Sequence, residues 1–219
     1  TVARFTAPQD RNLFSPVLLA HQKCRMGNGK IMSYLSDYYL YPVSFDGVIY
    51  GSQLLQADAI RTAVEHFRRN RGRCMGALYW QLNDCWPTVS WPAIDSEGVG
   101  KALYYASKKF FAPVLLSAHE KGSDVTFNVS NETKDAFHGS IRLAVRAQNF
   151  ATVYETKIPV SVAALSSVDA AEVSFAEVIR GREADCYLTY TLEDRTGETL
   201  SEAVMLFVKP KCYHYRKPR

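Results

Sequence analysis

The sequence has no long apolar run and little that marks a disulfide-rich or metal-binding protein. Its longest nearly apolar stretches, such as 112–118 and 204–208, are far shorter than the roughly 20 residues of a membrane-spanning helix. The five cysteines are odd in number and form no C-x-x-C pair, which argues against a zinc site or a disulfide framework. We therefore expect no metal site and no cofactor, and a reducing, cytoplasmic compartment is favoured.

The chain also carries little net charge. The formal net charge is only +4 over 219 residues, which gives weak attraction to polyanions. The basic residues gathered in 68–73 and 209–219 lie in no recognisable nucleic-acid-binding motif, and no charged-then-apolar signal segment opens the chain. Neither nucleic acid nor a membrane is expected as a partner.

The composition that remains is that of a folded protein, with 47% apolar and 12% aromatic residues. The length suits one large domain or two modest ones, and we expect two because the local pattern changes along the chain. Because the first residue is Thr1 and not Met, we expect a processed chain or a piece of a longer protein.

Residues 1–111 show the pattern of an α/β protein. Short helices are expected over 14–22 and 31–39, and apolar residues at three- and four-residue spacing predict an amphipathic helix over 52–69 with Ser52 as its N-cap. The apolar run 75–82 does not alternate, which is typical of a strand buried on both faces of a parallel sheet. A loop with two prolines follows, and then a helix over 101–111.

After a boundary near 111–114 the sequence predicts an all-β sandwich, because short alternating segments are separated by turn signals. The expected strands are 125–129, 140–147, 152–162, 173–178, 185–193 and 203–208, with breaks that include 166–170. Residues spaced by two should face inward: Val125, Phe127, Val129, Ile141, Leu143, Val145, Leu188, Tyr190 and Leu192. Thr189 and Thr191, which alternate with Leu188, Tyr190 and Leu192, should face solvent.

The three tryptophans of the chain, Trp80, Trp86 and Trp91, fall in one short segment. They begin where the expected buried strand ends, and α/β proteins place ligands at the carboxyl ends of such strands. An indole face suits the C–H face of a sugar ring, while Asn83 and Asp84 offer hydrogen bonds to hydroxyl groups. We expect Trp80 to contact a ligand, and Trp86 and Trp91, which lie beside prolines, to serve packing.

The segment YWQLND-x-WP-x-x-SW, followed by D-x-x-G-x-x-K-x-x-Y-Y, resembles the end of the catalytic barrel in β-mannosidases of glycoside hydrolase family 2. The resemblance implies an α+β multidomain protein in which a partial (β/α)-barrel, its last helix–strand–helix units, is followed by an immunoglobulin-like all-β sandwich. Residues 1–111 would be the carboxyl-terminal part of the barrel, 112–208 the sandwich, and 209–219 a linker to a missing domain.

The resemblance also implies a retaining exo-glycosidase, which needs two carboxyl groups about 5–5.5 Å apart. The family supplies them from an Asn-Glu pair and from a Glu on barrel strands that this chain does not contain, so the nucleophile would lie just before Thr1. Asn131 and Glu132 reproduce the dipeptide, but in a turn of the expected sandwich, and we reject them. We therefore expect no catalytic residue here, and Asp84 to be a polar support.

The leading hypothesis is thus the carboxyl-side piece of an exo-β-mannosidase that hydrolyses terminal β-D-mannose residues of oligosaccharides or glycans. Trp80, Asn83 and Asp84 would be its substrate-binding residues, and its partners would be the glycan and the remaining domains of the parent enzyme. The alternatives are a non-catalytic carbohydrate-binding module and a sister β-galactosidase or β-glucuronidase. A glucuronidase should offer a basic pair for the sugar carboxylate, and the loop after Trp91 holds only Lys101.

Overall fold

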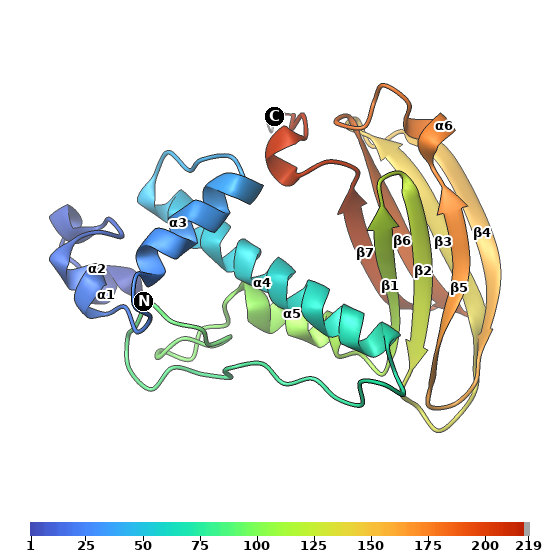
Figure 1. Cartoon of the computed structure of the whole chain (residues 1–219), viewed down its shortest axis with the longest axis horizontal. Coiled ribbons are helices and arrows are strands. Elements are labelled where there is room, and N and C mark those ends of the chain that lie inside the picture. The colour runs from blue at the N-terminus through green and yellow to red at the C-terminus, as the bar shows by residue number, and fades with distance from the viewer. Residues whose placement is uncertain (217–219) are drawn as a thin grey trace. The chain divides into compact units, whose positions relative to one another are not determined.

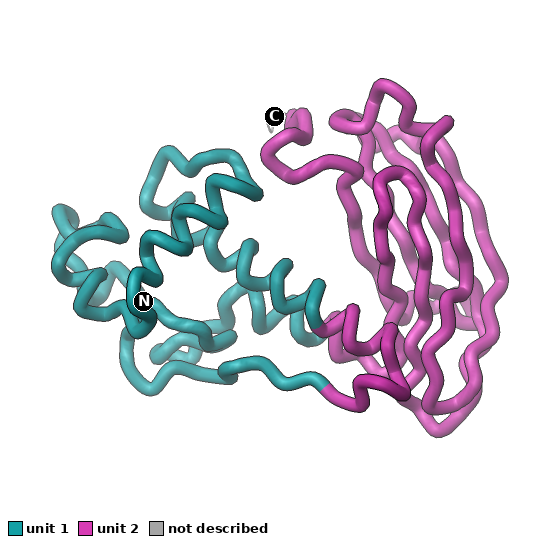
Figure 2. The backbone as a smooth tube through the Cα atoms, viewed as in Figure 1, with its two compact units in different colours: residues 1–63, 77–108 teal, residues 64–76, 109–219 magenta. Residues whose placement is uncertain are grey.

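A computed structural model describes residues 1–216 of the chain. The chain forms two compact units, shown in Figure 2. The first unit consists of residues 1–63 and 77–108, and the second consists of residues 64–76 together with the chain from Lys109 onward. The second unit therefore includes a short segment that precedes the loop with the tryptophans.

The first unit is built from helices and connecting segments. Its helices, with two that continue into the second unit, are α1 (Val2–Phe5), η1 (Pro8–Asp10), α2 (Pro16–Ala20), α3 (Gly27–Tyr38), α4 (Phe45–Arg69) and α5 (Ala102–Phe110). The helices predicted at 14–22, 31–39 and 101–111 are confirmed. The predicted start of the long helix at Ser52 is wrong, because Ser44 accepts a hydrogen bond from the Gly47 N–H (3.1 Å) and caps the helix about two turns upstream.

The buried strand predicted over 75–82 is not formed. The segment is irregular, and the side chains of Met75 and Leu78 are exposed, that of Leu78 completely. A parallel strand exists only where neighbouring strands accept and donate its backbone hydrogen bonds, and no strand among residues 1–216 pairs with this segment. The helical part of the predicted fold is present, and the strand between its helices is not.

The second unit contains the predicted β-sandwich (Figure 1). Three antiparallel strands lie in the order β1-β2-β5, and four antiparallel strands lie in the order β4-β3-β6-β7. The elements are β1 (Val114–Lys121), β2 (Asp124–Asn131), β3 (Phe137–Ala147), β4 (Thr152–Val162), β5 (Ser166–Ser174), α6 (Ala176–Ile179), β6 (Cys186–Asp194), β7 (Thr199–Leu206) and η2 (Pro210–Cys212).

The core of the sandwich confirms the predicted alternation. All nine residues predicted to face inward are at most 2% exposed. The Phe127 ring contacts the rings of Tyr190 and Phe175, with centroids 5.7 and 6.5 Å apart. Thr189 and Thr191 are half-buried rather than fully exposed, because Thr189 Oγ1 donates to the Ala144 carbonyl at 3.2 Å. The two faces of β6 therefore differ in burial as expected, with a smaller contrast.

Two strand predictions in the sandwich need correction. The predicted strand 173–178 is the end of β5 followed by the helix α6, and the predicted break at 166–170 is the first half of β5. The sequence analysis also missed β1. β5 is rich in Ser, Ala and acidic residues, which are poor strand formers, and its pairing with β2 holds it extended.

The end of the predicted linker is outside the described residues, because these stop at 216 and the linker runs over 209–219. The described part contains the 3₁₀ turn η2, and the His214 N–H donates to the Ala184 carbonyl at 2.8 Å. This part therefore lies against the sandwich. Its role as a linker stays a prediction.

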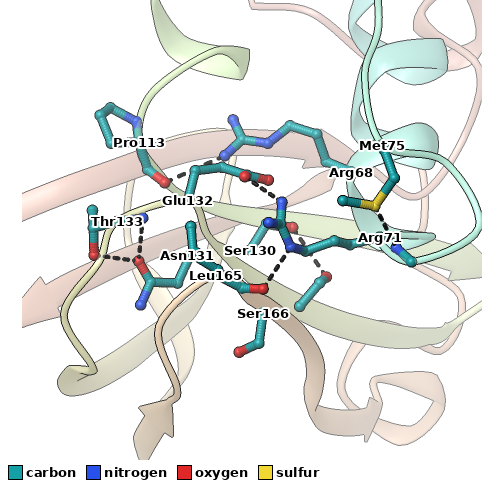
Figure 3. A network of polar contacts seen from close by, with 12 residues as sticks. Arg68, Arg71, Met75, Pro113, Ser130, Asn131, Glu132, Thr133, Leu165 and Ser166 are labelled. Atoms are coloured by element: carbon teal, nitrogen blue, oxygen red, sulfur yellow. Dashed lines mark hydrogen bonds and ion pairs between the residues drawn. The ribbon is translucent and has the colours of Figure 1, made fainter.

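Two arginines at the end of α4 explain why residues 64–76 belong to the second unit (Figure 3). Arg68 Nη1 donates to the carbonyls of Phe110 and Ala112 at 2.7 and 2.8 Å. Arg71 pairs with Glu132, and its Nε donates to the Leu165 carbonyl at 2.6 Å. Both guanidinium groups thus bind the segment that leads into the sandwich and one of its turns.

We expect Arg68→Met to lower the free energy of unfolding by about 1 kcal/mol, because carbonyls at the end of α5 lose a charged donor. Burial lowers the pKa of Arg68 from its ordinary value, against the opposing effect of Glu132 and Glu65. A guanidinium group nevertheless stays charged at neutral pH. Denaturant unfolding measures the loss. The control Arg180→Met removes an exposed i,i+3 pair with Glu177 and should change stability by less than about 0.5 kcal/mol. Equal effects of the two substitutions would contradict this role of Arg68.

Candidate functional site

The loop that carries the tryptophans is held together by backbone pairing within the first unit. The Ala93 and Ile94 N–H groups donate to the carbonyls of Gln81 and Leu82 at 3.0 and 2.9 Å, and the Asp84 N–H donates to the Ile94 carbonyl at 3.0 Å. On the other side, the Lys101 N–H donates to the Ala93 carbonyl at 2.8 Å. Segments 81–84 and 99–101 therefore flank 93–95, and we call this arrangement the three-segment loop.

A buried ion pair joins the two outer segments of the three-segment loop. Lys101 Nζ lies 3.0 Å from Asp84 Oδ2, and the side chains are 13% and 3% exposed. Asp84 is thus turned inward, as the expected polar support requires. From the sequence alone, Lys101 was considered only as the single cation in the loop after Trp91. The signal that could have pointed to it is its place at the end of the D-x-x-G-x-x-K segment.

Trp80 lies immediately before the first of these backbone hydrogen bonds, and its side chain is 73% exposed. Exposure alternates along the segment, because Leu78 and Trp80 are exposed whereas Tyr79 is half-buried. Asn83 is also exposed, and its Nδ2 lies 3.3 Å from the Asp84 carbonyl. The peptide bond between Trp80 and Gln81 is cis. The structure thus leaves an indole and a carboxamide open at the start of the loop.

Trp86 is engaged by its own neighbours. Lys23 Nζ lies 4.1 Å from the centre of its ring, and the His21 ring packs on it at 5.1 Å. His21 in turn stacks on Phe5 at 4.3 Å, and its Nδ1 lies 2.5 Å from the Pro87 carbonyl. These contacts fit a packing role for Trp86. The sequence analysis did not foresee that His21 links this loop to the amino-terminal helices.

Trp91 is partly exposed, and its backbone carbonyl accepts a hydrogen bond from Gln56 Nε2 at 2.6 Å. Gln56 lies on α4, so this bond holds the middle of the loop to the long helix of the same unit. The contact uses the backbone of Trp91 and fixes its position. The packing role expected for the Trp91 side chain stays a prediction.

The other carboxylates near the tryptophans are also occupied. Burial raises the pKa of Asp95, but hydrogen bonds from Thr1 and from the Val99 and Glu97 N–H groups outweigh it, so the pKa lies below its usual value. Glu97 pairs with Arg4. Asp95 therefore holds a turn as a carboxylate and is a poor proton donor at neutral pH.

The Asn131-Glu132 dipeptide lies at the end of β2, in the second unit. Asn131 is fully buried, and its Nδ2 donates to the carbonyls of Asp135 and Ala163 at 2.8 and 3.0 Å. Glu132 pairs with Arg71. Both side chains stabilise turns of the sandwich, which agrees with their rejection as a catalytic pair.

Among residues 1–216, no group of three or more His, Cys, Asp or Glu side chains is arranged to hold a metal ion. No helix of this part of the chain is long and apolar enough to cross a membrane.

Comparison with known proteins finds similarity to β-mannosidases. Residues 123–211 match the Mannosidase Ig/CBM-like domain family. The chain is 33% identical to a β-mannosidase of Capra hircus over 140 residues, which are 58% of this chain and 16% of that protein. It is 27% identical to β-mannosidase A of Aspergillus clavatus over 174 residues, which are 72% of this chain and 19% of that protein. The chain thus spans less than a fifth of these relatives in the matched regions.

Solved structures extend the match to nearly the whole chain. The crystal structure of a β-D-mannosidase from Dictyoglomus thermophilum superposes with a TM-score of 0.88 and 25% identity, over 96% of this chain and 26% of that one. The exo-chitosanase CsxA of Amycolatopsis orientalis shares the fold, with a TM-score of 0.78 and 21% identity over 94% of this chain and 25% of that one. The chain is therefore related to the carboxyl-terminal part of the β-mannosidases of glycoside hydrolase family 2, through similar relatives, a similar solved structure and the match of residues 123–211 to the Mannosidase Ig/CBM-like domain.

Proposed function

We propose that the chain is the carboxyl-side piece of a retaining exo-β-mannosidase that removes terminal β-D-mannose residues from oligosaccharides or glycans. Its catalytic carboxylates would lie upstream of this chain. The observation that carries the proposal is that the indole of Trp80 and the amide of Asn83, three residues apart at the start of the three-segment loop, are both exposed. An exposed aromatic face with an adjacent hydrogen-bonding group suits a sugar ring.

The partners follow from the same proposal. Large apolar side chains of the first unit are exposed in unusual number: Met26, Tyr34, Leu40, Tyr41, Val43, Tyr50 and Leu78. Extended apolar exposure is typical of a surface that another protein part covers, and here the remaining domains of the parent enzyme would cover it. All five cysteines are free thiols, as a cytoplasmic enzyme would keep them.

The Asp84–Lys101 pair bears on the sister activities. A glucuronidase needs a cation that is free to bind the sugar carboxylate, and Lys101 is buried against Asp84 instead. This pairing favours a neutral sugar such as mannose over a uronic acid. A non-catalytic carbohydrate-binding module remains the alternative from another class of function.

The test is the substrate preference of the full-length protein that contains this chain. We expect it to hydrolyse an aryl β-mannoside at least ~10-fold faster, in kcat/KM, than the matching β-galactoside, β-glucuronide or β-glucosaminide. Proton NMR of the first product should show retention of the anomeric configuration. Preference for another glycoside would support a sister enzyme, and binding of mannosides without hydrolysis would support a binding module.

A further inference from the structure

We propose that Asp84 and Lys101 form a positioning pair that holds Trp80 and Asn83 in place for the sugar, and that neither charged group touches the substrate. The inference rests on the proposed function and assigns how the site is built. It differs from a direct hydrogen bond between Asp84 and a sugar hydroxyl, which the sequence alone left open.

The position of the pair supports this role. Asp84 ends the segment that begins just after Trp80, and Lys101 ends the segment 99–101 on the far side of 93–95. Their 3.0 Å contact closes the three-segment loop across its middle segment. Only a few backbone hydrogen bonds hold the three segments together, so one strong side-chain contact carries much of their alignment.

The burial of the pair supports it as well. With 3% of its side chain exposed, Asp84 offers little surface to a ligand, whereas Trp80 and Asn83 are open. A buried charge that loses its partner is strongly unfavourable, whereas removal of both charges together costs little. The surrounding segments should therefore shift when one charge is removed and return when the second is removed too.

The different effects of removing one charge and of removing both distinguish a positioning role of Asp84 from direct contact with the sugar. If Asp84 only positions its neighbours, the double variant D84N/K101M should regain the activity that D84N loses. If the Asp84 carboxylate binds the sugar, removal of Lys101 cannot restore the lost contact. The pair of variants therefore tests the proposal without knowledge of the bound geometry.

The experiment compares kcat and KM of the full-length enzyme with an aryl β-mannoside for D84N, K101M and D84N/K101M. We expect each single variant to lower kcat/KM about fivefold, mainly through KM, and the double variant to return to within about twofold of wild type. The control E97Q removes the exposed pair with Arg4 in the same loop and should leave both constants unchanged.

A second measurement, amide hydrogen exchange, can be made on variants of low stability and requires no substrate. In this chain, hydrogen exchange at the Asp84, Ile94 and Lys101 amides should be at least ~10-fold faster in D84N and should recover in D84N/K101M. A double variant as impaired as D84N, or unchanged exchange in D84N, would overturn the positioning role. A parent inactive on mannosides that shows the expected exchange would contradict the proposed function only.

Discussion

The isolated chain is expected to hydrolyse no aryl β-mannoside above the uncatalysed rate. Retaining hydrolysis depends on a carboxylate nucleophile and a carboxylic acid about 5–5.5 Å apart, and both act in the transition state. Glycosidases accelerate reactions that are otherwise extremely slow, so loss of both groups removes a rate factor of many orders of magnitude. This is the largest effect that the proposed function predicts.

The carboxylates near the tryptophans in the sequence are not free to take over this chemistry. Asp84 is buried against Lys101, and Glu97 is paired with Arg4. The acid of a retaining enzyme must hold a proton near neutral pH, which requires a raised pKa, and the pKa of Asp95 is lowered. Each of the three groups is thus already engaged by a partner of its own.

The measurement is release of the chromophore from an aryl β-mannoside by the purified chain, with the full-length protein as positive control. Turnover by the chain that disappears in Asp84→Ala would contradict the prediction and would make Asp84 a catalytic residue. Turnover that survives this substitution would point to a contaminating glycosidase. Further purification of the chain should then remove the activity, whereas activity of the chain itself would remain and would contradict the prediction.

The sandwich could be predicted from the sequence because its signal is local. Val125, Phe127 and Val129 alternate with polar residues, as expected of a strand that turns one face to an apolar core. β5 could not be placed, because its Ser, Ala and acidic residues carry no such pattern and its conformation depends on pairing with β2. The segment 75–82 failed for the opposite reason: its composition suits a buried strand, but pairing partners decide whether a strand forms.

The candidate site divides in the same way. The cluster of tryptophans pointed to Trp80 and to Asn83, because residue types and their order are visible in the sequence. The pairing of Asp84 with Lys101 depends on a parallel contact between 81–84 and 93–95 and an antiparallel contact between 93–95 and 99–101, and no local pattern encodes it. The contacts of Lys23 and His21 with Trp86 likewise join parts of the chain that are far apart in sequence.

In the full-length enzyme, Trp80→Ala is expected to lower kcat/KM by at least ~10-fold, which is ~1.4 kcal/mol of transition-state binding. The indole is the largest exposed aromatic surface at the start of the loop, and its removal deletes the proposed wall of the terminal sugar subsite. Trp80→Phe should recover part of the loss because a ring face remains. Steady-state kinetics with an aryl β-mannoside measure both variants.

Substitutions at two neighbouring residues, Trp86 and Tyr79, distinguish loss of substrate contact from loss of folded structure. Trp86→Ala removes the same type of side chain at a position where Lys23 and His21 contact the ring. It should reduce thermal stability, while kcat/KM of the folded enzyme changes less than about threefold. Tyr79→Ala should act in the same direction, because Tyr79 is half-buried and alternates with Trp80. An unchanged kcat/KM in Trp80→Ala would refute the assignment of Trp80. A loss in Tyr79→Ala alone would mean that the opposite face of this segment binds the sugar.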